Sequence, residues 1–333
     1  MKGFVGSIAG VVFIVLILSF FVPLPLMIMS PGIAQELSPM ITVEDGYKGQ
    51  SQGDFMLTAV SSQRATIWDY AYISIQKPLG VELEPISEHL PKGMNMEQYY
   101  ELMKIMMEDS KNQSVAIAFK KAGYQVDITY HGAVIEDVLD NGIAKGKLQI
   151  GDIIIAVDEK EVRTNQDAID IIREHDVGDE VKITVKRGEE TLDYTMKTKE
   201  LENHSEESIP SIGVRILSKV DYDFPREVIF HTENIGGSSA GGMFTLEIYN
   251  QLTENDITSG RRIAGTGTID QEGNIGAIDG VEQKVIAAER NDAVIFLVPA
   301  ENYEAAKETA TTIEVVLIET IDDAINYLEG NLN

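Results

Sequence analysis

The sequence predicts an α+β fold in which one membrane-spanning helix precedes a globular body. Two observations lead to this prediction: the N-terminus is apolar and uncharged, and the rest of the chain mixes strand-like and helix-like periodicities. With 333 residues and 44% hydrophobic content, the chain is long enough for two domains or for one domain that carries an insertion.

The chain is strongly acidic and has no cysteine. Its 27 basic and 54 acidic residues give a net charge of −27, which repels nucleic acid and anionic lipid headgroups at long range. We therefore expect no nucleic-acid partner. The absence of cysteine excludes disulfides, thiol catalysis and cysteine-ligated metals, and the sequence predicts neither a cofactor nor a metal site.

Residues 1–30 are predicted to form a transmembrane signal anchor. The run from Phe4 to Met29 carries no charged side chain and is long enough to cross a bilayer. The alternative is a cleaved signal peptide, although such peptides have apolar regions of only roughly 7–15 residues. Lys2 precedes the run and Glu36 follows it, so the charge bias predicts a single-pass protein of the cell membrane with a cytoplasmic N-terminus and an extracellular body.

Residues 31–124 are predicted to contain short strands and one long helix. The stretches 53–62 (GDFMLTAVSS) and 68–75 (WDYAYISI) are rich in β-branched and aromatic side chains, which is typical of strands. Residues 94–122 repeat apolar side chains at helical spacing, and Gly123 is a suitable residue to end that helix.

Residues 125–200 alternate short β runs with glycine turns and contain one predicted helix, near Asn165 to Arg173. The stretch GAVIEDVLDNGIAKGKLQIGDIIIAVDEKEV resembles the PDZ domains of bacterial proteases almost position by position. This resemblance implies a module that captures an extended peptide at an open sheet edge. The residues that it places along the groove are His131, Gly132, Ala133 and Val134. The carboxylate-binding loop of that family usually reads apolar-Gly-apolar, which the stretch YHGA does not match.

The last region, residues 201–333, follows a polar linker and contains the motif GSSAG, Gly237 to Gly241. This motif matches the GxSxG turn on which α/β-hydrolases hold a serine nucleophile. That mechanism needs a histidine later in the chain, but the last of the five histidines is His231, which precedes the motif. A Ser-Asp-His triad in that order is therefore excluded.

A lysine kept neutral by burial can replace histidine as the base for a serine. The last region has three lysines, and of these Lys284 lies on a predicted helix whose other face is apolar, with Val281, Val285, Ile286 and Ala288. Its amine is therefore expected near the boundary of the core. Lowering a lysine pKa from about 10.4 to near 7 needs roughly 4–5 kcal/mol of desolvation, which buried lysines reach.

Three sequence blocks of the last region closely resemble the proteolytic domain of the Lon protease family, which uses a Ser-Lys dyad. They are GGSSAGG, AGTGTIDQEGNIG and GVEQKVIAAER, in that order. The resemblance implies that Ser239 is the nucleophile, Lys284 the base and Thr266 a residue that orients the lysine. Ser238 stands where the family commonly has proline, so Ser238 remains an alternative nucleophile. A further alternative is that either serine only caps the following helix.

The start of the helix after Ser239 is a suitable place for an oxyanion, because backbone N–H groups there are unpaired and the helix dipole is positive. The N–H groups expected to form the oxyanion hole are those of Gly237, Ser239 and Ala240.

Taken together, the chain resembles the membrane-anchored, PDZ-containing Lon-like proteases of Gram-positive bacteria. This resemblance implies that residues 31–124 form the first part of a Lon-like domain and that the PDZ-like module is inserted into it. The GxxxxGK[ST] phosphate-binding motif is absent, so we expect ATP-independent cleavage of peptides or unfolded segments of exported or membrane proteins. The module would dock substrates or gate the site. The alternative is a non-catalytic, membrane-tethered peptide-binding protein, and a homo-oligomer is left open.

Overall fold

The computed structural model describes residues 22–47, 52–90, 94–139, 141–200, 209–232 and 235–330. The chain divides into two compact units. Unit 1 comprises residues 1–125 and 224–333, and unit 2 comprises residues 126–223. The chain of unit 1 is thus interrupted by unit 2, which is the arrangement of an inserted domain.

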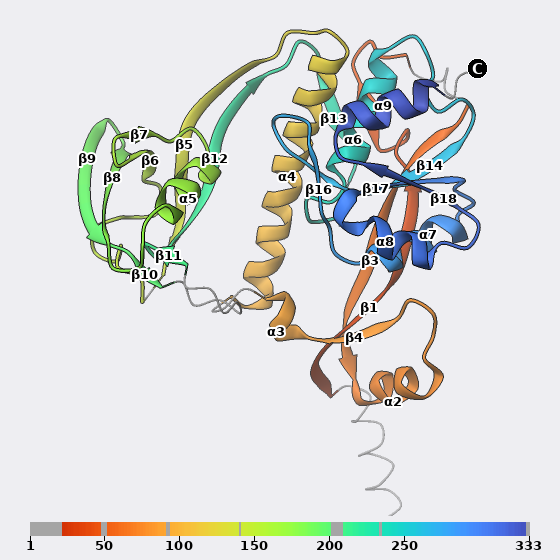
Figure 1. Ribbon diagram of the computed structural model, residues 1–333, viewed down its shortest axis with the longest axis horizontal. Helices are drawn as coiled ribbons and strands as arrows, with labels where there is room; N and C mark the ends of the chain where they lie inside the picture. Colours follow the sequence, from red (N-terminus) through yellow and green to blue (C-terminus); the bar gives the residue numbers. More distant parts are fainter. Residues whose placement is uncertain are drawn as a thin grey trace, which may run out of the picture. The chain divides into compact units, whose positions relative to one another are not determined.

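Unit 1 is built on a mixed sheet with the strand order β18-β17-β14-β3-β1-β4 (Figure 1). Strands β3, β14, β17 and β18 are parallel to one another, whereas β1 is antiparallel to both β3 and β4. The bounds of these strands are β1 Pro23–Glu36, β3 Asp54–Thr66, β4 Glu82–Pro85, β14 Arg262–Gly265, β17 Ile295–Pro299 and β18 Glu314–Ile318.

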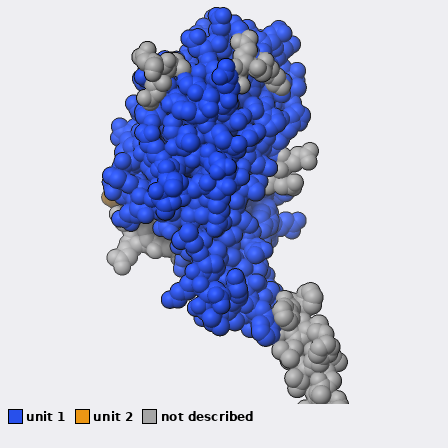
Figure 2. Space-filling model, turned by 90° about the vertical axis from the view of Figure 1, so that its right-hand side faces the viewer, with its two compact units in different colours: residues 1–125, 224–333 blue, residues 126–223 orange. Residues whose placement is uncertain are grey.

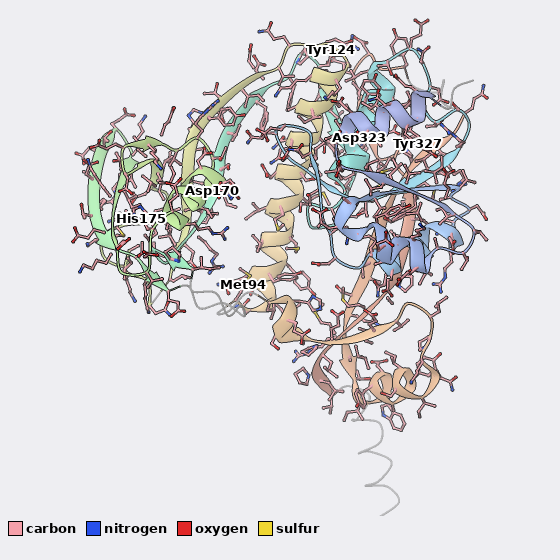
Figure 3. All side chains as sticks on the ribbon, viewed as in Figure 1. Met94, Tyr124, Asp170, His175, Asp323 and Tyr327 are labelled. Atoms are coloured by element: carbon pink, nitrogen blue, oxygen red, sulfur yellow. The ribbon has the colours of Figure 1, made fainter. Side chains whose placement is uncertain are left out.

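Helices cover this sheet and position the candidate site. Helix α7 packs on β1, β3 and β14, and α4 lies beside α6 (Figure 1). The helices of unit 1 are α2 Ile67–Gln76, α3 Ile86–His89, α4 Met96–Lys121, α6 Gly241–Leu252, α7 Val281–Arg290, α8 Tyr303–Thr309 and α9 Ile321–Gly330. Met94 and Tyr124, labelled in Figure 3, lie just beyond the two ends of α4. The core between the sheet and α7 includes Met56, Val285 and Phe296, each at most 1% exposed.

Unit 1 also contains two short antiparallel strand pairs. They are β2 Ile41–Val43 with β13 Val228–Phe230, and β15 Thr268–Ile269 with β16 Ile275–Gly276. Strand β13 leads towards the GSSAG motif, and β15 follows Thr266, so both pairs adjoin the segments that carry the candidate catalytic residues.

Unit 2 has a sheet of order β12-β5-β6-β8-β9, in which β12 is an edge strand. Its core is apolar and includes Ile135, Ile154 and Ile183, none of which is exposed. The elements are β5 Asp127–Val138, β6 Ile153–Val157, β7 Lys160–Glu161, α5 Asn165–Arg173, β8 Glu180–Arg187, β9 Glu190–Lys197, β10 Lys199–Glu200, β11 Pro210–Ser211 and β12 Val214–Asp223. Strand β12 belongs to this unit, although the sequence placed the end of the module at residue 200.

The end of the predicted membrane anchor requires a correction. Residues Pro23 to Met29 lie in strand β1, where Pro23 takes the first position and Pro31 lies at a break in the register with β3. Proline is tolerated at both kinds of position because neither needs its missing N–H. Residues 1–21 lie outside the described residues, and none of the described helices is long and apolar enough to span a membrane.

A second correction concerns residues 68–75, which the sequence predicted as a strand and which form helix α2. The Thr66 side chain accepts a hydrogen bond from the Asp69 N–H, and the Asp69 carboxylate accepts one from the Thr66 N–H. This capping box satisfies two backbone donors at the helix start. The side chains of this segment favour a strand, but the residues at its two ends favour a helix. These are the capping box at the start and Pro78 just after the last turn.

Candidate active site

The GSSAG motif forms a turn that leads directly into α6. The first helical residue, Gly241, packs so closely that a Cβ there would lie 2.6 Å from Ile269 Cγ2 and 3.0 Å from the Ile269 backbone nitrogen. Only glycine therefore allows this approach between α6 and β15. Ser238 and Ser239, at the tip of the turn, are both half-buried.

Lys284 projects from the first turn of α7 towards this serine turn. Its residue is 3% exposed, and its Nζ lies 3.0 Å from Ser239 Oγ and 3.1 Å from Thr266 Oγ1. Both distances are those of ordinary hydrogen bonds. The structure therefore brings together the three side chains that the sequence selected from three separate blocks.

Thr266 links the lysine to the backbone of the serine. It follows β14, where its N–H donates to the Leu297 carbonyl on β17 at 3.0 Å. Its hydroxyl donates to the Ser239 carbonyl at 3.1 Å, which leaves the oxygen lone pairs directed at Lys284 Nζ. The Gly267 N–H donates to the same Ser239 carbonyl at 2.9 Å. Ser239 is thus fixed through its main chain by the segment that also orients the lysine.

The electrostatics shift Lys284 towards its neutral form. Burial lowers the pKa of Lys284 to about 8, and the charge of Asp279 acts in the opposite direction. Removing an ammonium group from water disfavours its charged form, which is the physical cause of this lowering. A lysine with a pKa near neutrality can accept a proton from a serine hydroxyl at physiological pH.

The geometry separates the two adjacent serines. Lys284 Nζ donates to the side chain of Ser239. Ser238 instead bonds through its carbonyl, which accepts from Ser110 Oγ at 3.2 Å and from the Gly241 N–H at 3.3 Å. The N-cap of α6 is Ala240, which has no side-chain capping bond, so neither Ser238 nor Ser239 caps this helix.

The three N–H groups predicted to bind an oxyanion differ in whether they already donate a hydrogen bond. The Gly237 N–H already donates to the Met103 carbonyl on α4 at 2.8 Å, so in this structure Gly237 is not free to bind an oxyanion. For Ser239 and Ala240, the described part of the chain offers their N–H groups no acceptor. These two N–H groups are therefore the ones that remain for an oxyanion.

Helix α4 contributes contacts that the sequence did not predict. Ser110 and Ser114, both buried, face the serine turn: Ser110 Oγ donates to the Ser238 carbonyl, and Ser114 Oγ donates to the Gly241 carbonyl at 2.9 Å. The only sequence signal was a pair of serines at i and i+4 on the apolar face of a predicted helix.

The predicted peptide groove of the PDZ-like module requires a correction. Gly132, Ala133 and Val134 pair with β12, and Ala133 and Val134 also pair with β6. His131 Nε2 lies 2.7 Å from an Asp221 carboxylate oxygen, which is a structural contact within the sheet. Strand β5 therefore has a strand partner on both sides at Ala133 and Val134, where it offers no edge to a peptide.

The edge of this sheet near α5 is formed by β12 instead. Helix α5 packs against β12, and the Asn165 N–H donates to Ser218 Oγ at 2.9 Å. The turn before β12 reads Ile212-Gly213-Val214, the apolar-Gly-apolar pattern that YHGA lacks. Gly213 has φ +76°, and a Cβ there would lie 2.4 Å from Gly142 Cα, so this turn requires glycine. The signal was present in the sequence but lay beyond the predicted end of the module.

No group of side chains suited to bind a metal ion occurs among the residues that the structure describes. The arrangement around Ser239 brings together a hydroxyl, an amine and backbone N–H groups of the chain itself.

Two protein-family models match the chain. Residues 94–198 match the PDZ domain, and residues 232–329 match the Lon protease (S16) C-terminal proteolytic domain. The chain therefore combines a PDZ domain with a Lon-type proteolytic domain. The second match contains Ser239, Thr266 and Lys284.

Curated relatives match parts of the chain. The Lon protease of Rickettsia typhi is 28% identical over 122 residues, 35% of this chain, and that of Phenylobacterium zucineum is 33% identical over 93 residues, 27% of this chain. Protease Do-like 8 of Arabidopsis thaliana chloroplasts is 40% identical over 55 residues, 16% of this chain. The matches cover only 12–15% of the length of these relatives.

Among solved structures, the chain is similar to the PDZ domain of the SdrC-like protein from Listeria monocytogenes. The identity is 30%, and the match covers 27% of this chain and 92% of that domain, with a TM-score of 0.25. A solution structure from Geobacillus thermodenitrificans is also 30% identical and covers 21% of this chain and 82% of that one, with a TM-score of 0.20.

Proposed function

We propose that this protein is a serine endopeptidase that uses Ser239 as nucleophile and Lys284 as base. The observation that carries the proposal is the 3.0 Å hydrogen bond between Lys284 Nζ, buried and with a lowered pKa, and Ser239 Oγ. We infer that the substrates are flexible segments of exported or membrane proteins and that cleavage needs no ATP.

The proposed reaction starts with neutral Lys284. Its amine takes the proton of Ser239 Oγ as the oxygen attacks a peptide carbonyl carbon, and the N–H groups of Ser239 and Ala240 hold the oxyanion. The lysine then gives that proton to the leaving amine, which yields an acyl-enzyme and a free peptide N-terminus. A water molecule, deprotonated by the same lysine, releases the acyl group and restores the hydroxyl of Ser239.

Cleavage of an unfolded protein by single variants tests this proposal. Ser239→Ala and Lys284→Met should each lower kcat by at least about 10³-fold, because each removes a group that the reaction needs. Ser238→Ala is the matched control and should retain activity, and added ATP should not change the rate. Equal cleavage by wild type, Ser239→Ala and Lys284→Met would exclude the dyad and favour the non-catalytic alternative.

We propose that the PDZ domain docks substrate as an added strand on β12, between β12 and α5, with the Ile212–Val214 turn at the peptide's C-terminus. The support is that β12 is the edge strand and that the turn carries the apolar-Gly-apolar pattern. Excess peptide with a free carboxylate should slow hydrogen exchange of amides in β12, and its amidated twin should do so less. Slower hydrogen exchange confined to β5, together with faster exchange in β12, would contradict this placement.

We propose further that residues 4–21 anchor the protein in the cell membrane with the body outside the cytoplasm. These residues contain no charged side chain, and at 1.5 Å per residue a helix of this length reaches about 27 Å. Protease added to intact cells should degrade both units. Protection of the body would contradict the orientation.

A further inference from the structure

Helix α2 exposes an apolar and aromatic surface. Trp68, Tyr72 and Ile75 follow one another at i, i+4 and i+7, which places them on one face of the helix, and they are 39%, 61% and 76% exposed. Leu79, just past the helix, is 73% exposed. The opposite side is fixed by Ile73, which packs with Ile28 and Ala65. Ile73, the one buried residue of α2, therefore attaches the helix to unit 1, and the stripe of Trp68, Tyr72 and Ile75 stays exposed.

The position of α2 in the fold relates this surface to the proposed anchor. Pro23, the first residue of β1, is the register partner of Thr66, the N-cap of α2. Register partners in an antiparallel pair have Cα atoms about 4.5–5.5 Å apart. In Figure 1, α2 lies at the end of unit 1 where β1 begins, and this is the narrow lower end of the unit in Figure 2. A chain that leaves a bilayer just before Pro23 therefore places the start of α2 close to the bilayer surface.

The composition of this segment suits the membrane–water interface. Tryptophan and tyrosine concentrate there because their rings are apolar and their tips are polar. Residues 63–81 carry Arg64, Asp69 and Lys77 as their charged side chains, in a chain with a net charge of −27. Two positive and one negative side chain give this segment a net charge of +1, so it does not itself add to the long-range repulsion between this acidic protein and anionic lipid. With ten residues, α2 is far too short to span a bilayer.

We propose that α2 lies flat in the membrane interface and contacts lipid through Trp68, Tyr72, Ile75 and Leu79. This inference rests on the proposed anchor, and it adds that the catalytic unit is held by two contacts rather than by a single tether. Two contacts fix the orientation of unit 1 towards the membrane, which a flexible tether does not. Such an interfacial helix binds by burying its apolar face at the boundary of headgroups and acyl chains.

Trp68 is the single tryptophan of the chain and provides a direct test. The full chain is reconstituted into vesicles of phosphatidylcholine and phosphatidylglycerol with bromine either near the headgroups or near the acyl-chain ends. We expect bromine near the headgroups to reduce Trp68 emission at least about twofold. Bromine near the acyl-chain ends should reduce it less. The triple variant Tyr72→Ser, Ile75→Ser, Leu79→Ser should lose most of this quenching and keep its cleavage of a soluble peptide. Leu317→Ser with Val294→Ser, which removes exposed apolar side chains of β18 and its neighbourhood, should lose none.

The outcomes distinguish a failure of the interfacial role of α2 from a failure of the proposed membrane anchor. Flotation of the chain with vesicles but without Trp68 quenching would overturn the interfacial role of α2 and leave the anchor standing. Absence of flotation would overturn both. Acrylamide quenching of Trp68 provides a further outcome. If quenching decreases with protein concentration and does not depend on lipid, a second copy of the chain covers α2, and the proposal is overturned.

Discussion

At the scale of single residues, the site depends on a lysine whose surroundings conflict with its charge. Lys284 is almost fully buried, and its Nζ has two hydroxyl oxygens within hydrogen-bond distance. Hydroxyl groups can either donate to a neutral amine or accept from a charged one, so they tolerate both protonation states. Burial decides the balance by lowering the pKa to about 8, so about a tenth of the lysine is neutral at pH 7.

The first prediction concerns the pH dependence of cleavage. Because the proposed reaction needs the neutral amine of Lys284, kcat/KM should rise about tenfold per pH unit below pH 8 and level off above it. Initial rates on a short peptide between pH 5.5 and 9.5 measure this profile, and Ser238→Ala should share it. A rate that falls as the pH rises through 8 would show that the lysine acts in its charged form.

The second prediction is that Lys284→Met inactivates the protein and stabilises unit 1. At pH values below about 8 the lysine is charged in both the folded and the unfolded state, so the full desolvation penalty opposes folding. Between about 8 and 10.5 the unfolded state binds the extra proton, so wild-type stability rises with pH. Removing the amine should therefore raise the free energy of unfolding by up to about 3 kcal/mol at pH 7, less the lost hydrogen bonds.

Urea unfolding of wild type and Lys284→Met at pH 7 and pH 10 measures this difference. The gain should be largest at pH 7 and should shrink as the pH approaches 10. A variant that is less stable than wild type at both pH values would indicate that the hydrogen bonds of Lys284 outweigh its desolvation.

At the scale of elements, the sequence predicted the helices and strands whose local pattern and burial agree. Helix α5 was expected at its observed bounds, Asn165 to Arg173, and α4 within two residues at its start. Helix α2 was missed because its side chains favour a strand, whereas its capping box and C-terminal turn favour a helix. The first residues of strand β1 were assigned to the predicted anchor, because they are uncharged and continue its apolar run.

In the candidate site, too, local sequence patterns predicted some residues, whereas contacts between distant segments were not predicted. Ser239, Thr266 and Lys284 were selected from sequence blocks and lie together in the structure. The support from α4 was not predictable, because Ser110 and Ser238 are 128 positions apart and no local pattern connects them. The sequence placed an open sheet edge at β5, whereas the edge strand is β12. The difference arises because strand pairing depends on long-range register, which a single strand does not reveal.

The third prediction is that α4 positions the serine turn. Replacing both Ser110 and Ser114 with alanine removes the hydroxyls that donate to the Ser238 and Gly241 carbonyls. We expect kcat to fall about tenfold with KM nearly unchanged, because the turn loses its alignment while the substrate-binding surface stays intact. Lys104→Ala, on the exposed side of α4, is the control and should leave kcat unchanged. A variant that changes KM alone would assign these serines to substrate binding.

At the scale of the whole molecule, the chain enters and leaves unit 2 through neighbouring strand ends. Asp127 at the start of β5 is the register partner of Asp223 at the end of β12. Within unit 1, the Phe119 ring on α4 contacts both Tyr124 and Phe224, with centroid distances of 5.5 and 6.2 Å. The ends of the interruption in unit 1 are therefore fastened to the same helix that supports the serine turn.

The fourth prediction follows from this connection. Replacing residues 126–223 with a short Gly/Ser linker should leave unit 1 folded, because the aromatic contacts of Phe119 hold both ends of the gap and no core residue of unit 1 is removed. Cleavage of a short soluble peptide should persist within about threefold of wild type, because such a substrate needs only the Ser239 site. Cleavage of a long unfolded protein should fall at least about tenfold through a higher KM, because the proposed docking strand β12 is lost. Faster cleavage of both substrates would instead identify unit 2 as an inhibitor of the site, and loss of peptide cleavage in a folded variant would identify it as an activator that acts on the serine turn through α4.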